Sequence, residues 1–244
     1  PAPEILRLLA SMGSSFDCAS VAEIEMAMDA GASADRISYG NTIKKERDIL
    51  RAFELGIRLF AIDCVEEAEK IGRVAPGSKV FCRVLTDGAG AEWPLSRKFG
   101  CAPSMAIDVL RHAKALNLTP WGVSFHVGSQ QVNLDAWDRA LADAKMVFAT
   151  LAEEGIVLGL VNMGGGFPTR YLKDVPSAQS YGQAIFGYLR KHFGNVLPET
   201  IIEPGRGMVG NAGTIKTEVV LISKKADNDN QRWVFLDIGK FGGL

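Results

Sequence analysis

Short apolar runs rich in β-branched residues alternate along the chain with longer stretches in which apolar residues recur every three or four positions. The short runs are typical of buried strands, and the longer stretches are typical of amphipathic helices. This alternation continues to about Gly213 and predicts βαβ units with a parallel sheet. Strands are expected at 16–19, 36–39, 59–63, 80–84, 123–127, 158–163 and 200–203. Helices are expected at 4–12, 21–30, 46–55, 65–74, 104–116, 134–154 and 179–193.

The number of predicted strands favours a barrel that is one strand short. A (β/α)8 barrel of the TIM type needs eight strands to close, and a seven-stranded version would leave two unpaired edges. The chain opens with two prolines that lead directly into a helix, as though a strand had just ended. We therefore expect residues 1–213 to form an α/β barrel of the (β/α)8 type whose first strand precedes Pro1.

The pattern changes after Gly213. Two β-rich runs, 214–223 and 233–238, are joined by a polar stretch with no helical periodicity between them. Two strands make only a marginal unit, so residues 214–244 are expected to be antiparallel β structure that opens a larger C-terminal β domain.

Composition narrows the class of protein. A chain of 244 residues with 47% hydrophobic residues can bury a large core, and its net charge of -1 provides no basic field for nucleic acid. The four cysteines stand singly, without the CxxC pairs of a structural zinc site, so no metal is expected. No signal peptide or membrane-length apolar run is apparent. These features predict a cytoplasmic protein that binds neither nucleic acid nor a membrane.

Polar residues and glycines lie where the predicted strands should meet their loops, which is where barrels of this type place their active sites. They are Asp17, Arg83, His126, Ser129, Gly164–Gly166 and Glu203–Arg206.

Two of these positions suggest phosphate binding. Three consecutive glycines, Gly164–Gly166, allow backbone N–H groups to surround an anion, although a tight turn would explain them equally well. Arg206, on the adjacent strand end, favours phosphate because a guanidinium group can bind phosphate oxygens in a bidentate manner.

Two further positions suggest chemistry on a bound ring. By alternation His126 shares a face with Ser124, although an isolated histidine is more often a core residue, and no second ligand at metal-binding spacing accompanies it. Glu203 ends an apolar strand, where a carboxylate needs a positive or protonated partner. That partner is either Arg206, in a salt bridge, or a pyridine nitrogen.

The motifs, taken together and in this order, resemble the ornithine decarboxylase family of pyridoxal 5'-phosphate (PLP)-dependent decarboxylases, which combine an alanine-racemase-like barrel with a β domain. The motifs that carry the resemblance are Phe16–Ser20 with Glu23, Lys98–Gly100, Gly122–Ser129, Gly164–Pro168 and Glu203–Arg206.

The resemblance implies a role for each matching residue. His126 would stack on the PLP ring, Glu203 would bind the pyridine nitrogen, and Arg83 would help to fix the cofactor. Asp17 and Glu23 would orient the charged groups around it, and Lys98 would lie at the interface of a homodimer. The phosphate would be held by Ser129, Gly205, Arg206 and the glycine loop Gly164, Gly165 and Gly166.

The same resemblance implies that parts of the active site lie outside the sequence. The family's Schiff-base lysine is expected just ahead of Pro1, since no lysine precedes Lys44, and its C-terminal Cys-Asp motif is absent. The implied reaction is decarboxylation of a basic amino acid, and the favoured substrate is L-ornithine, which would give putrescine and CO2. Alternatives are lysine or dual lysine/ornithine decarboxylation, diaminopimelate decarboxylation, a non-catalytic protein resembling the antizyme inhibitors, and an ordinary phosphosugar barrel enzyme.

Overall fold

A computed structural model describes residues 2–93 and 98–239 of the chain. It divides into two compact units, Pro1–Met208 and Val209–Leu244, each of which is described by itself.

The first unit is built on a parallel sheet of seven strands that neighbour one another in chain order. Sequential order with helical crossovers is the winding of a (β/α)8 barrel, and here β1 and β9 form the two edges of the sheet. All seven strands predicted from the sequence are present. They are β1 (Phe16–Cys18), β2 (Ile37–Tyr39), β3 (Leu59–Ile62), β4 (Lys79–Arg83), β6 (Thr119–Ser124), β8 (Leu160–Asn162) and β9 (Glu199–Ile201).

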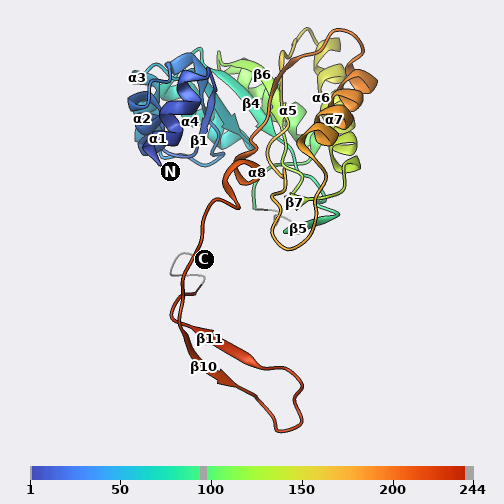
Figure 1. Ribbon diagram of the computed structural model, residues 1–244. Helices are drawn as coiled ribbons and strands as arrows, with labels where there is room; N and C mark the ends of the chain where they lie inside the picture. The colour runs from blue at the N-terminus through green and yellow to red at the C-terminus, as the bar shows by residue number, and fades with distance from the viewer. Residues whose placement is uncertain (1, 94–97, 240–244) are drawn as a thin grey trace. The chain divides into compact units, whose positions relative to one another are not determined.

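Helices alternate with these strands, and each predicted helix agrees with the structure to within one residue at either end (Figure 1). Local capping explains two of the starts: the side chains of Ser20 and Ser177 accept backbone hydrogen bonds at the first turns of α2 and α7. The helices are α1 (Pro3–Ser11), α2 (Val21–Asp29), α3 (Glu46–Glu54), α4 (Val65–Val74), α5 (Pro103–Ala115), α6 (Asp135–Glu153) and α7 (Ala178–Phe193).

The central strands of the sheet are buried on both faces. Phe60 and Cys82 belong to the large core beneath the helices, whereas Ala61 and Phe81, one residue away, pack in a smaller cluster on the opposite face. Because successive side chains of a strand point to opposite faces, this division explains why the strands read as continuous apolar runs.

Trp137 of α6 anchors the part of the core under α6 and α7. Its indole is fully buried and packs against Phe167 and Tyr181, with ring centroids 5.3 and 5.5 Å away. We expect Trp137→Ala to lower the free energy of unfolding by about 3–5 kcal/mol, because it deletes a large buried ring and leaves a cavity. Chemical denaturation of the full-length protein measures this change, and a loss below about 1 kcal/mol would contradict the assigned packing.

The structure also contains elements that the sequence analysis missed. β6 begins at Thr119 rather than at residue 123. The sequence analysis missed its first residues because Pro120 is unusual inside a strand, and the register against β4 shifts at that point. A separate antiparallel pair joins β5 (Ala91–Trp93) to β7 (Ser129–Gln131), and a short helix, α8 (Gly205–Val209), follows the last strand.

The second unit is a β-hairpin within its described residues, 209–239. β10 (Val219–Ser223) pairs in antiparallel fashion with β11 (Trp233–Leu236), with a register shift near Leu221. The two β-rich runs of the sequence are therefore antiparallel strands, as predicted. The last residues of the expected β domain, 240–244, lie outside the described part of the chain.

Candidate functional site

A cavity of about 300 Å³ opens at the carboxyl ends of the parallel strands. It brings together four side chains that the sequence analysis had singled out from separate strand ends, namely those of Asp17, Arg83, His126 and Glu203. The complete lining is Asp17, Ala19, Gly40, Asn41, Phe81, Arg83, Phe99, Ser124, Phe125, His126 and Glu203.

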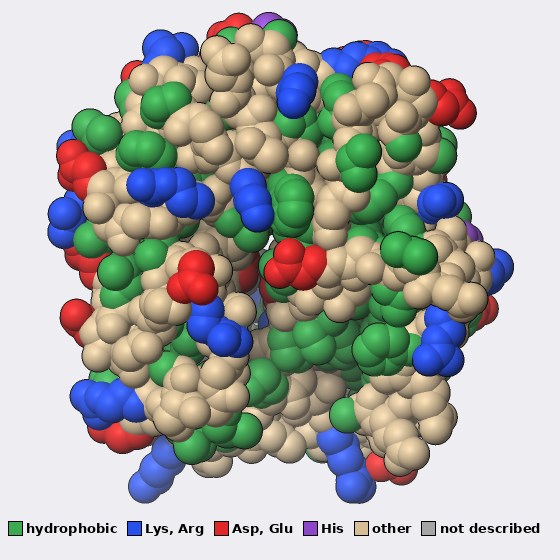
Figure 2. Space-filling model, turned by 90° about the horizontal axis from the view of Figure 1, so that it is seen from above, with side chains coloured by type: hydrophobic (Ala, Val, Ile, Leu, Met, Phe, Trp, Pro, Cys, Tyr) green, Lys and Arg blue, Asp and Glu red, His purple; other side chains and the backbone are tan. Residues whose placement is uncertain are grey.

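Figure 2 shows blue and red side chains intermixed over one face of the molecule, in keeping with the balanced net charge.

Asp17 lies in β1, and its carboxylate faces this cavity. Its carboxylate accepts a short hydrogen bond from Ser38 Oγ. Burial, followed by the negative charge of Glu203, raises the pKa of Asp17 to about 8, while Ser38 and Arg83 oppose the shift. A Cβ at Gly40 would overlap this carboxylate, so any larger residue there would displace the Asp17 side chain.

The raised pKa of Asp17 predicts a pH dependence of stability. The folded protein keeps a proton on Asp17 that the unfolded chain releases near pH 4, so stability falls as the pH rises from about 4 to about 8. We expect Asp17→Asn to reduce this slope and to make the cofactor-free, full-length protein more stable than wild type at pH 8. Denaturation midpoints measured across this pH range test the expectation, and identical slopes for the two proteins would rule it out.

Glu203 follows β9 and is held by Asn162 of the neighbouring strand. Asn162 is fully buried; its Nδ2 donates to Glu203 Oε1 at 2.7 Å, and its Oδ1 accepts from the backbone N–H of Gly164 at 2.9 Å. Burial raises the pKa of Glu203, and the hydrogen bond from Asn162 and the charge of Arg83 oppose this effect. Asn162 was missed from the sequence, although a lone amide inside an apolar strand was the available signal.

His126 is a neutral imidazole in this site. Burial, with the nearby charge of Arg83, lowers its pKa to about 4. Its Nδ1 accepts a hydrogen bond from the backbone N–H of Gly128 at 3.0 Å, which assigns the ring proton to Nε2. Ser124 and His126 both line the cavity, as predicted, but Phe125 between them lines it too, because β6 ends at Ser124 and the strict alternation of a strand does not continue beyond it.

The glycine loop approaches these groups closely. Gly164 and Gly166 have φ angles of 62° and 104°, which disfavour other residues. A Cβ on Gly165 would lie 2.9 Å from both His126 Nε2 and the Glu203 carbonyl oxygen. The loop thus lies directly beside the imidazole ring of His126 and the backbone of Glu203.

Other predicted residues lie outside the cavity lining. Glu23 accepts a hydrogen bond from Ala19 N at 2.6 Å and so supports the end of β1. Ser129 begins β7, and Arg206 is exposed on α8, where it donates to Tyr171 Oη at 3.1 Å. The salt bridge between Glu203 and Arg206 that we considered is not formed between these described residues.

A parallel α/β barrel sheet with a neutral histidine, a buried carboxylate and a glycine loop at its carboxyl end defines a cofactor-binding barrel. Residues 1–210 match the model of the family described as pyridoxal-dependent decarboxylase, pyridoxal binding domain. The chain belongs to this family, which confirms the resemblance inferred from its motifs.

Individual relatives agree with this assignment. The chain is 34% identical to lysine/ornithine decarboxylase of Selenomonas ruminantium over 99% of its own length and 61% of that protein. It is 33% identical to antizyme inhibitor 2 of Xenopus laevis over 98% of its length and 55% of that protein. The chain therefore spans between half and two thirds of these two relatives.

A solved structure confirms the fold class. The crystal structure of an SrLDC mutant in complex with PLP superposes with a TM-score of 0.82 and 32% identity, over 98% of this chain and 61% of that one. The parallel sheet and its helices thus match the barrel of a known PLP-binding protein.

The residues of the cavity fit PLP. Within residues 2–93 and 98–239, Asp17, Arg83 and Glu203 face one space and form no ion pair with another side chain. A carboxylate that ionises in this space needs a neutralising partner, and a ring with a protonated nitrogen would supply one. The neutral imidazole of His126 suits stacking on that ring, so the residues of the site are compatible with the cofactor in charge.

None of the helices within residues 2–93 and 98–239 is both long and apolar enough to cross a membrane. Nor do the described segments place three or more histidine, cysteine, aspartate or glutamate side chains so that they could hold a metal ion.

Proposed function

We propose that the full-length protein is a PLP-dependent decarboxylase of a basic amino acid, acting first on L-ornithine to give putrescine and CO2. The observation that carries this proposal is Glu203, a buried carboxylate without an ion-pair partner that is fixed by Asn162 in the cavity of a PLP-binding fold. When bound, PLP supplies an electron sink for the pair of electrons that CO2 leaves behind.

Glu203 would bind the protonated ring nitrogen and keep the proton there. The hydrogen bond from Asn162 leaves one carboxylate oxygen, Oε2, for this contact. Burial raises the pKa of Glu203, so a positively charged partner would be needed to keep its carboxylate ionised at this position. Glu203 is thus the residue that would set the protonation state of the ring.

The remaining residues would position the cofactor. His126 presents a neutral ring whose orientation is fixed through Nδ1, which suits stacking rather than ion pairing. Arg83 lines the same cavity and would offset the cofactor's negative charge. We assign the phosphate to the backbone of Gly164, Gly165 and Gly166 with Ser129, Gly205 and Arg206.

Substrate choice is proposed from kinship rather than from the cavity. The bacterial relative is named for both lysine and ornithine, so a dual specificity is the nearest alternative. Comparison of kcat/KM for ornithine and for lysine with the full-length protein distinguishes ornithine preference from dual specificity. A ratio of the two kcat/KM values near one would show dual specificity.

The alternative from another class of function is a non-catalytic binding protein. It is supported by the presence of an antizyme inhibitor among the relatives. Against it stands the intact set of Asp17, Arg83, His126 and Glu203 around one cavity. A binding protein would not need to maintain these four ionisable side chains around one cavity.

We also propose that the enzyme is a cytoplasmic homodimer with Lys98 at its interface. Lys98 lines a small cavity of about 100 Å³ beside Arg83 and His126, which would bring a second subunit close to the active site. Light scattering of the full-length protein determines the oligomeric state, and Lys98→Glu is expected to weaken the dimer. A monomeric wild-type protein would contradict this part of the proposal.

Borohydride reduction of the full-length protein with PLP tests the proposed function. Before reduction we expect visible absorption from PLP joined to a lysine; borohydride should abolish this absorption, and mass mapping should then place the reduced adduct on a lysine upstream of Pro1. Absence of any adduct in a chain that includes the upstream segment would refute the enzyme and favour the binding protein. An adduct on Lys44 would instead show that the wrong lysine had been assigned.

A further inference from the structure

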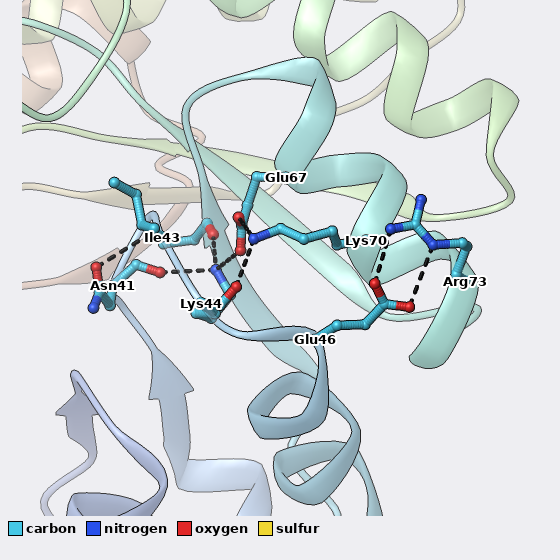
Figure 3. A network of polar contacts seen from close by, with 8 residues as sticks. Asn41, Ile43, Lys44, Glu46, Glu67, Lys70 and Arg73 are labelled. Atoms are coloured by element: carbon cyan, nitrogen blue, oxygen red, sulfur yellow. Dashed lines mark hydrogen bonds and ion pairs between the residues drawn. The ribbon is translucent and has the colours of Figure 1, made fainter.

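The side chain of Lys44 is fully buried beside the proposed cofactor site but does not line the cavity (Figure 3). It lies in the segment between β2 and α3. Its Nζ donates to the carbonyl oxygens of Asn41 at 2.7 Å and Ala61 at 2.6 Å and forms an ion pair with Glu67 Oε1 at 3.0 Å. One ammonium group therefore joins the β2–α3 loop to the end of β3 and to α4.

A second lysine completes this network. Lys70 Nζ pairs with Glu67 Oε2 at 2.5 Å and donates to the backbone carbonyl oxygen of Lys44, also at 2.5 Å. The loop is thus held through both the side chain and the backbone of Lys44, as Figure 3 shows.

Stability alone gives a weak reason for a buried pair of this kind. The side chains of Lys44 and Glu67 are 0% and 3% exposed, and the desolvation of such a pair often offsets its attraction. Burial lowers the pKa of Lys44 to about 8, although the charge of Glu67 opposes this effect. The lowered pKa shows that burial disfavours the charged form of Lys44. Apolar side chains of similar volume would fill this space at no greater cost.

The atoms that Lys44 holds belong to the wall of the cavity. Asn41 lines it directly, and its Oδ1 accepts from Ile43 N at 3.2 Å, which closes the loop on itself. The neighbouring Gly40 donates its N–H to Cys18 O at 2.9 Å and lies against the carboxylate of Asp17. A shift of Asn41 would therefore move Gly40, which borders the carboxylate of Asp17.

We propose that Lys44 is a positioning residue of the PLP site, which holds the Gly40–Asn41 wall and thereby the Asp17 carboxylate without touching the cofactor. This inference rests on the proposed function of the cavity. The two hydrogen bonds and the ion pair of Lys44 Nζ would thus serve to maintain affinity for the cofactor rather than to stabilise the fold.

The test compares Lys44→Met with the double variant Lys44→Met/Glu67→Met in the full-length protein. The single change strands Glu67 and is expected to reduce both stability and PLP affinity. The double change removes both buried charges, so stability should return to near the wild-type value while the bonds to Asn41 and Ala61 remain absent. We expect the Kd for PLP to stay roughly 10- to 100-fold above wild type in the double variant.

Hydrogen exchange of the cofactor-free proteins gives a readout that does not involve turnover. Faster exchange confined to the segment 38–43 is expected in the double variant. Arg73→Met is the matched control: it breaks the exposed ion pair with Glu46, 2.9 Å long, between α4 and α3, and should leave exchange and PLP affinity unchanged.

The outcomes separate this inference from the proposed function. If wild-type protein binds PLP and the folded double variant binds it equally well, Lys44 is a structural residue only and the inference is overturned. If wild-type protein itself binds no PLP, the proposed function fails, and the inference fails with it. Weak binding with wild-type stability in the double variant supports both.

Discussion

Glu203→Gln is expected to lower the turnover of the full-length enzyme on the order of 100-fold or more when PLP and substrate are saturating. The amide keeps the hydrogen bond from Asn162, since Gln Oε1 accepts as the carboxylate does, but it can no longer hold a proton on the ring nitrogen by charge. An unprotonated ring is a much poorer electron sink, so the chemical step loses more than cofactor binding.

A second readout separates this role from a structural one. Burial raises the pKa of Glu203, so its charge destabilises the cofactor-free protein at neutral pH, and the neutral amide should make that protein more stable. We therefore expect turnover and stability to change in opposite directions, as is common at active sites.

The matched control is Glu199→Gln, the same change at the exposed start of the same strand, β9, which should leave kcat and stability unchanged. Weakened PLP affinity with unchanged turnover at saturation would falsify the assignment of Glu203 to the ring nitrogen.

The hydrophobic pattern predicted the barrel well because the central strands are buried on both faces and each of the helices α2 to α7 buries one face. Phe60 and Ala61 are adjacent in sequence yet face different clusters, so β3 reads as an uninterrupted apolar run that is easily told from a helix. The rule that barrel sites form at carboxyl ends then placed Asp17, Arg83 and Glu203 together without knowledge of the fold's details.

Features that depend on contacts between distant segments were not predictable in this way. The pairing of β5 with β7 joins residues about forty positions apart, and neither strand has a long apolar pattern of its own. Lys44 reads as a solvated loop lysine in the sequence, and only the approach of Ala61 and Glu67 from other elements buries it. Burial and pairing of a charged residue are properties of the folded chain rather than of a local pattern.

Gly165→Ala is expected to weaken PLP binding by the full-length protein roughly 10- to 100-fold. The backbone of Gly165 does not have a positive φ, so alanine is not excluded by conformation. The added Cβ would instead lie 2.9 Å from His126 Nε2 and from the Glu203 carbonyl oxygen. The backbone is less able to yield than the imidazole, so His126 should move out of its stacking position and lose the hydrogen bond from Gly128.

Titration of the cofactor-free protein with PLP measures this effect, and Gly187→Ala in α7 is the matched control because its Cβ would meet no atom within 4 Å. The control should bind PLP as wild type does and gain about 0.5–1 kcal/mol of stability from the better helix former. Gly165→Ala should lose about 1–3 kcal/mol through overpacking, yet remain folded. Wild-type PLP affinity in that folded variant would mean that neither the glycine loop nor the position of His126 controls the cofactor site.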